Sequence, residues 1–233
     1  LAFGGLLILI SLAIVLIPST PLSSNRTADN HIDTGSTWNA YKPLLLRKDI
    51  WLLLSVRLTI TTFWGMATLA IPLLIYRVSN SESLPAYFAA ISLIVAAIFQ
   101  LGTGLISDRT GHKLPLIISA MGILLSTFGL ALFPTSLLGV FISGSFLTGT
   151  AWSVSTLVPK LINEIATTNE RNRVVGLGHL AWSISMFSGN LVGGYLIDIY
   201  VSLPFVAGCI LTTLGIIFSW KLCRHLDNVK SKS

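Results

Sequence analysis

Seven apolar runs, bounded by charges, prolines or turn residues, dominate this chain of 233 residues. A transmembrane helix needs roughly 20 mostly apolar residues to cross about 30 Å of hydrocarbon. The strict apolar–polar alternation of an outer-membrane strand is absent from the runs, and backbone groups in lipid must be paired within a helix or a closed barrel. The runs therefore predict an all-α polytopic membrane protein with helices at 1–18, 50–76, 84–107, 114–133, 136–160, 174–197 and 202–222.

The composition is typical of a membrane protein. Hydrophobic residues make up 53% of the sequence and charged residues only 10%, and the mean hydropathy is +0.79. A water-soluble domain carries about 25% charged residues, so a soluble domain, a disordered chain and a coiled coil are excluded. Two cysteines, Cys209 and Cys223, cannot form a disulfide framework.

The basic residues lie in alternate connections. Of the 15 Lys and Arg residues, all but Arg57 and Arg77 fall in the stretch 19–48, the connections after 107 and after 160, or the C-terminal tail. Short loops rich in Lys and Arg face the cytoplasm, so we expect these segments and the C-terminus inside a cell membrane. The lipid bilayer is then the expected partner, and the net charge of +6 requires no nucleic acid.

We expect four parts along the chain. Residues 1–18 are predicted to be a transmembrane helix cut by a fragment boundary, because the run is short and begins at Leu1 without an initiator Met. Residues 19–48, rich in Ser, Thr, Asn and Pro, are predicted to be a cytoplasmic linker. Residues 49–223 form the predicted six-helix bundle, and 224–233 the cytoplasmic tail.

The six helices of the bundle carry a faint internal repeat. The second helix of each successive triple ends in Gly-x-x-x-Asp, first as Gly104 to Asp108 and then as Gly194 to Asp198. Triples related by inversion in the membrane plane are a common plan of transporters, so the pattern favours a 3+3 inverted repeat.

The most specific motif is the connection GLISDRTGHK. It fits Gly-x-x-x-Asp-Arg-x-Gly-x-Lys, in which a small residue lets helices approach, an acid sits at a helix end, and a glycine makes a tight turn between basic residues. Its members are Gly104, Asp108, Arg109, Gly111 and Lys113. The loop closely resembles the signature loop of the major facilitator superfamily, and it departs from it at His112, where that family commonly has Arg.

Two further stretches resemble the same family. An acid and arginine loop is similar to the one that the family places after its tenth helix, and it consists of Glu164, Glu170, Arg171 and Arg173. The run from Gly189 to Gly194 is like the Gly-Pro-x-x-Gly-Gly run of antiporter members, with Asn190 in place of Pro. The resemblance covers the whole chain as the last helix of the family's first half, the central loop and the second six-helix half.

The resemblance implies a secondary transporter in which two six-helix halves rock about a substrate site near the midplane. The implied partners are a small-molecule solute, a proton as a candidate coupling ion, and an N-terminal half of the same chain. No cofactor or metal is implied. In such a protein Asp108 would pair with basic residues in one access state, and the candidates are Arg109 and the region of Arg173.

Polar and aromatic residues form stripes on the helices that the family turns toward its central cavity. Spacings of three and four place them on one face of each helix. The cavity candidates are Arg57, Thr61, Trp64, Thr68, Gln100, Thr148, Trp152, Thr156, Trp182 and Asn190. Ser and Thr also line dry helix contacts in membranes, so packing remains the alternative for each hydroxyl.

Two ionisable residues enter the predicted membrane region. Arg57 either snorkels to the inner interface or attracts an anionic group in the cavity. His179 is favoured as structural, with a proton-coupling role as the alternative. Every acidic residue falls at a predicted helix end or in a loop, so we expect any coupling carboxylate of the path to lie before Leu1.

Three classes of function can be compared. A transporter is favoured by the topology, the signature loop and the polar stripes. A membrane enzyme would need paired acids, a Ser-His dyad or a metal cluster, and the four histidines are scattered. A receptor or assembly protein on the same scaffold is the third class. Within the transporter class, efflux of amphipathic compounds and uptake of a sugar or other metabolite are rivals.

Overall fold

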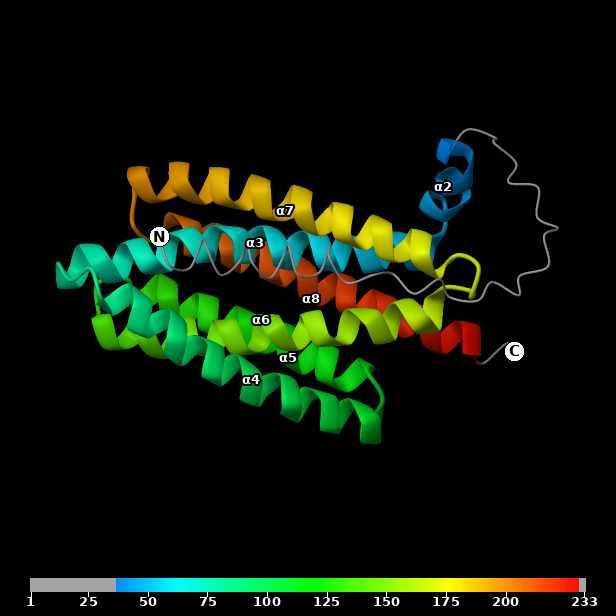
Figure 1. The fold of residues 1–233 in the computed structure, drawn as a ribbon, viewed down its shortest axis with the longest axis horizontal. Coiled ribbons are helices and arrows are strands. Elements are labelled where there is room, and N and C mark those ends of the chain that lie inside the picture. Colours follow the sequence, from blue (N-terminus) through cyan, green and yellow to red (C-terminus); the bar gives the residue numbers. More distant parts are fainter. Residues whose placement is uncertain (1–36, 231–233) are drawn as a thin grey trace, which may run out of the picture. The chain divides into compact units, whose positions relative to one another are not determined.

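The structure, a computed structural model, describes residues 37–230 (Figure 1). The helix predicted at 1–18 and the first part of the predicted linker lie outside the described residues. Six of the described helices are long and apolar enough to cross a membrane, as judged by their length and composition. They are α3 (Lys48–Ser79), α4 (Leu84–Thr110), α5 (Lys113–Leu132), α6 (Leu137–Ile165), α7 (Arg171–Ile199) and α8 (Leu203–Lys230).

Two helical segments extend beyond the predicted boundaries. The short helix α2 (Thr37–Leu45) lies inside the stretch predicted as a linker. At the other end, α8 continues to Lys230, past the predicted end of the bundle at residue 223. Its last turns are amphipathic, because Leu222 and Leu226 are buried while Lys221, Arg224 and Asp227 are exposed. The mean hydropathy falls in such a segment, so a hydropathy window does not include it, although the helical spacing of its apolar residues continues.

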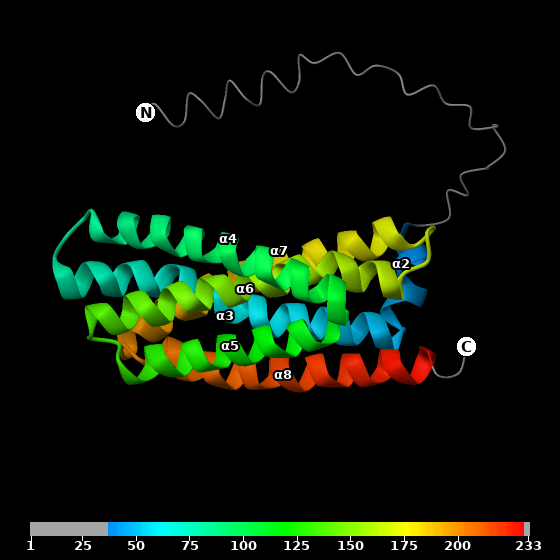
Figure 2. The same ribbon diagram turned by 90° about the horizontal axis from the view of Figure 1, so that it is seen from below.

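The packing of the helices repeats between the two triples α3–α5 and α6–α8. Helix α3 packs along α7 and α8, as α6 packs along α4 and α5 (Figures 1 and 2). The remaining major pair, α5 with α8, maps onto itself when the triples are exchanged. Pro72 and Pro159 also lie at similar places, near the ends of α3 and α6. This exchange symmetry is the arrangement expected of a 3+3 inverted repeat.

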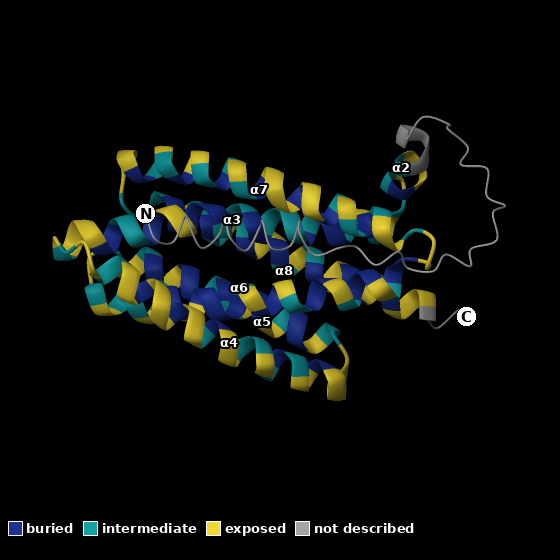
Figure 3. Cartoon of the chain, viewed as in Figure 1, coloured by how far each residue is buried: buried dark blue, intermediate teal, exposed yellow. Residues whose placement is uncertain are grey.

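Helices α3 and α6 form the centre of the bundle, and α4 and α7 lie at its margin (Figure 3). The most apolar windows of α3 and α6 are 56% and 50% buried, against 17% and 28% for α4 and α7. Burial along α4 and α7 is confined to one narrow stripe of mostly small residues, for example Ser92 and Ala96 on α4. Each of these two helices therefore packs through a single face.

Glycines bring α3 and α7 together. A Cβ atom added to Gly65 would lie 2.8 Å from the Met186 carbonyl oxygen and 3.2 Å from the Cα of Gly189. A Cβ atom on Gly193 would lie 2.7 Å from the Cα of Met66. Small residues that let backbones approach are the usual means of helix association in membranes.

Candidate functional site

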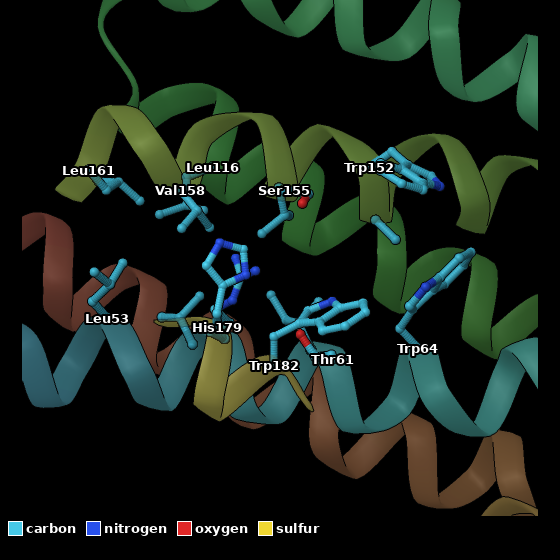
Figure 4. Close-up of a pocket in the computed structure, with 15 residues that line it drawn as sticks. Leu53, Thr61, Trp64, Leu116, Trp152, Ser155, Val158, Leu161, His179 and Trp182 are labelled. Carbon is cyan, nitrogen blue, oxygen red and sulfur yellow. The ribbon is translucent and has the colours of Figure 1, made fainter. Parts of the chain in front are cut away.

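A cavity of about 280 Å³ lies between the central helices (Figure 4). It is bounded by α3 and α6, with two residues from α7 and one from α5. The lining residues are Leu53, Val56, Arg57, Ile60, Thr61, Trp64, Leu116, Ala151, Trp152, Val154, Ser155, Val158, Leu161, His179 and Trp182. Because α3 and α6 are the helices that the internal repeat exchanges, the cavity lies between equivalent elements.

Half of the ten predicted cavity candidates line this space. The structure brings together Arg57, Thr61, Trp64, Trp152 and Trp182 from three helices. His179, which the sequence favoured as structural, also lines the cavity. Trp152 and Trp182 keep 40% and 41% of their surface exposed, so their rings are open to whatever occupies the space. An apolar cavity with a few convergent polar groups is the usual form of a small-molecule site.

The other five candidates, Thr68, Gln100, Thr148, Thr156 and Asn190, are not among the lining residues. Most of them bond within their own helix, as Ser and Thr often do. The Thr148 hydroxyl donates to Gly144 O at 2.9 Å, that of Thr156 to Trp152 O at 3.0 Å, and that of Thr68 to Gly65 O at 2.9 Å. Asn190 donates to Met186 O at 2.9 Å, and Gln100 is partly buried on α4.

The sequence did not single out Ser155 or the apolar wall of the cavity. Ser155 lies three residues after Trp152, on the same face of α6, and this spacing could have pointed to it. Leu53, Leu116 and Leu161 line the end of the cavity nearest the start of α3 and are buried, with 0–2% of their surface exposed. In Figure 4 the leucines lie at one side, Trp64 and Trp152 at the other, and His179 between them.

Arg57 is the one formally charged residue among the described residues that line the cavity. It lies about 14 Å along the helix from Lys48, at 1.5 Å per residue. Its Nε atom is buried and has no hydrogen-bond partner among the described residues. Snorkelling toward the start of α3 would carry the guanidinium past the buried leucines, so the cavity is the nearer polar environment.

Ion pairs gather at the end of the bundle where α3 begins and α8 ends, here called the basic end. Lys160 Nζ on α6 lies 2.6 Å from Asp108 Oδ1, in the last turn of α4. Lys160 is a partner that the sequence did not predict, since Arg109 and the region of Arg173 were the candidates. A carboxylate in the last turn of a helix faces the negative end of the helix dipole, and the lysine offsets that repulsion.

The turn of the signature loop requires glycine at one of its two glycine positions. Gly111 ends α4 with φ of +79°, a conformation that L side chains rarely adopt. Gly104 was expected to let helices approach, and among the described residues a Cβ atom added there meets nothing within 4 Å. It lies on the open side of α4, where no described helix packs.

The loop also holds α6 and α8 through a histidine–carboxylate contact and a further ion pair. His112, the departure from the family pattern, pairs with Glu164 of the acid and arginine loop. Both side chains are mostly buried, with 16% and 15% of their surface exposed. Lys113 pairs with Asp227 in the last turns of α8. The signature loop is thus tied to both helices of the second triple that end at the basic end.

Glu170 sits immediately before α7, and its Oε2 accepts a hydrogen bond of 3.4 Å from the backbone N–H of Thr167. Arg47 donates to the same oxygen at 2.9 Å and to Ile165 O at 2.8 Å. Hydrogen bonding from Thr167, followed by the charge of Arg47, holds the pKa of Glu170 below its ordinary value. Arg171 and Arg173 begin α7, Arg171 exposed and Arg173 partly buried.

Residues 1–164 match the family model described as Major Facilitator Superfamily. The chain belongs to the major facilitator superfamily. It is 24% identical over 165 residues to the tetracycline resistance protein, class C, of Escherichia coli, covering 69% of this chain and 41% of that protein. Against the class H protein of Pasteurella multocida it is 24% identical over 164 residues, covering 69% and 40%.

A solved structure shares the fold of this superfamily chain. The crystal structure of an auto-inhibited POT family peptide transporter matches with a TM-score of 0.67 at 17% identity, over 76% of this chain and 37% of that one. The chain thus spans about 40% of the length of the relatives that it matches. The family and the six apolar helices establish an integral, multi-pass membrane protein of a transporter family.

Within residues 37–230, one ion pair lies at the end of the bundle opposite the basic end. Arg77 on α3 lies 3.3 Å from Asp198, in the last turn of α7. Asp198 closes the second copy of the Gly-x-x-x-Asp pattern, as Asp108 closes the first. The two aspartates pair with α3 and α6, the helices that the internal repeat exchanges.

Proposed function

We propose that this protein carries out secondary active transport of a small organic solute by alternating access. The observation that supports this most directly is the cavity at membrane depth between α3 and α6, the equivalent helices of the inverted repeat. Transporters built from such repeats bind their substrates near the bilayer midplane at the interface between the repeats. The indoles of Trp64, Trp152 and Trp182 suit an amphipathic solute with a flat apolar part.

The proposed orientation places the basic end, the linker 19–48 and the tail after residue 223 in the cytoplasm of a cell membrane. The positive-inside rule supports it, because the basic connections lie at that end. The contacts there, including the hydrogen bond of 2.8 Å from Arg47 at the start of α3 to Ile165 O at the end of α6, would hold the cytoplasmic side of the cavity closed in this state. Buried leucines next to these contacts support the same closed inner end.

Efflux is the favoured direction. The matched relatives named as tetracycline resistance proteins support it, and uptake of a sugar or other metabolite is the alternative. A non-transporting receptor or assembly protein on the same scaffold would bind a ligand in the cavity without moving it.

Transport is tested with the full-length protein in proteoliposomes, by the flux of labelled amphipathic solutes with and without an imposed proton gradient. Ser155→Trp would fill the cavity and should abolish flux, while Ile142→Trp on the same helix, at a position 63% exposed on the outside, should preserve it. The proposal fails if the two variants transport equally well.

Proton coupling is tested separately. Among the described residues that line the cavity there is no Asp or Glu, and His179 is the titratable group that could exchange a proton there. We expect His179→Ala to keep coupled flux, with the coupling acid elsewhere in the protein. Loss of coupling with solute binding retained would place the proton on His179.

A further inference from the structure

We infer that the cavity selects organic anions, in which a carboxylate or similar group is attached to a flat apolar body. The inference rests on the proposed transport function and names its substrate class. It is carried by one charged side chain and three indoles that the fold brings to the same space.

Among the described residues that line the cavity, no acidic side chain balances its positive charge. Arg57 contributes a guanidinium, and no carboxylate stands among the described residues that line the space. Its buried Nε donor has no described partner. A buried donor on a charged group that is left unpaired is costly, and a charge-assisted hydrogen bond to a carboxylate relieves that cost. The Nε donor of Arg57 would therefore gain from an acceptor on a bound solute.

The apolar part of the solute follows from the rest of the lining. Apart from Arg57, Thr61, Ser155 and His179, the described lining consists of aliphatic side chains, one alanine and the three tryptophans. Trp152 and Trp182 reach the cavity from α6 and α7 with two fifths of their surface exposed. Indole faces stack on flat rings, so an aromatic or conjugated body fits them best.

Indoles also attract cations, so an organic cation is the rival ligand. In that case a carboxylate would normally share the site, or the site would at least hold no fixed positive charge. Arg57 would repel a cation at this membrane depth, where the local dielectric is low and screening by salt is weak. The sign of the one fixed charge decides for the anion.

Three of the four polar lining residues lie at a similar depth. Counted along their helices at 1.5 Å per residue, Arg57, Ser155 and His179 all fall about 12 to 15 Å from the helix end at the basic side. The indole of Trp64 lies farther along, at about 24 Å. By the same count Trp152 lies at about 20 Å and Trp182 at about 17 Å, so the anionic group would point toward the basic end and the flat body toward Trp64 and Trp152.

The test uses three probes with the same ring system and different charge: naphthoate, naphthylmethanol and naphthylmethylammonium. Binding to the full-length protein in nanodiscs is measured by equilibrium dialysis. We expect naphthoate to bind about tenfold or more tightly than the alcohol, because a charge-assisted bond replaces a neutral one. The ammonium probe should bind most weakly.

Variants assign the preference to Arg57. Arg57→Gln should remove the difference between naphthoate and the alcohol, and Arg57→Lys should retain most of it. Lys221→Gln, which removes a charge from an exposed position on α8, is the matched control and should leave the difference unchanged. If Arg57→Gln fails to fold, the Lys variant and the ranking of the three probes still decide.

Three outcomes overturn the inference: tighter binding of the ammonium or the alcohol, an unchanged preference in Arg57→Gln, or no binding of any probe. Flux assays with the same probes separate this from failure of the proposed function. Transport of the cation or the alcohol but not the anion would overturn the anion preference and leave transport standing.

Discussion

Asp108 and Asp198 occupy matching places at opposite ends of the bundle, each closing a Gly-x-x-x-Asp pattern and each paired with a cation on a central helix. The pairs are similarly exposed: 37% and 70% for Lys160 and Asp108, 43% and 74% for Arg77 and Asp198. The internal repeat therefore extends from the helix packing to the electrostatics of the two ends.

The matching pairs should bias access in opposite directions. Asp108→Asn should raise the labelling rate of a Ser155→Cys reporter from the basic end, and Asp198→Asn from the other end, because each frees the end of α4 or α7 from the central helix that lines the cavity. An impermeant thiol reagent applied to either side of proteoliposomes measures both rates, in a background lacking Cys209 and Cys223.

Each of these mutations should change stability by less than about 1 kcal/mol, since exposed ion pairs contribute little. Exchange of the charges in Asp108→Lys with Lys160→Asp should restore the labelling pattern. Equal shifts from both single variants, or none, would contradict the matching roles.

The contact between α3 and α7 should be sensitive to size. Gly65→Val should destabilise the bundle by about 1–3 kcal/mol or more, because the added carbons meet the Met186 carbonyl and the backbone of Gly189. Thermal unfolding followed by circular dichroism in detergent measures the change. Gly104→Ala, on open helix surface, is the control and should shift stability by no more than about 0.5 kcal/mol.

The contacts that Glu170 makes with Arg47 and Thr167 at the start of α7 should weaken in acid. The pKa of Glu170 is lowered in the folded protein, so its contribution is present above the ordinary carboxyl range and is lost as the pH falls through the lowered value. The melting temperature of the wild-type protein should therefore fall below about pH 4.5, where carboxyls begin to protonate. Glu170→Gln should be less stable than wild type at neutral pH, and the difference should shrink in acid.

The direction of the bundle in the membrane can be read by cysteine labelling. Thr110→Cys, at the end of α4, should react with an impermeant reagent only from the cytoplasmic side, and Ser83→Cys, at its start, only from outside. Both positions are exposed, so access depends on the membrane alone. Labelling of Thr110→Cys from outside whole cells would reverse the proposed orientation.

The helices were predictable from the sequence because twenty apolar residues have few other uses, and the family was predictable from the signature loop. It was harder to predict which residues of α6 face the cavity. The four-residue spacing that relates Thr148, Trp152 and Thr156 defines a stripe, but the facing surface also depends on what packs behind the helix. Thr103 donates a buried hydrogen bond of 2.8 Å to Ser153, which does not line the cavity, while Trp152 and Ser155 do. Thr148 shares their face of α6 but lies beyond the lined part of the helix.

The ion-pair partners could not be predicted, since sequence spacing says nothing about residues so far apart. Asp108 and Lys160 are 52 residues apart, and Arg47 and Glu170 are 123 apart. Their meeting depends on how four helices end at the same side of the bundle. The indoles were easier, because a tryptophan deep in a polar-striped helix has few other environments that satisfy its N–H.

Helices α3 and α7 are fastened at both ends, by Arg47 with Glu170 and by Arg77 with Asp198, and their backbones nearly touch at Gly65 and Gly189. The two helices therefore form one unit that is held at both ends and in the middle. Its counterpart is α4 with α6, fastened by Asp108 with Lys160 and by the bond between Thr103 and Ser153. Direct contacts between the α3–α7 unit and the α4–α6 unit are far fewer than the contacts within each unit. The two units are therefore joined to each other mainly through α5 and α8, which pack along both the central helices and one another.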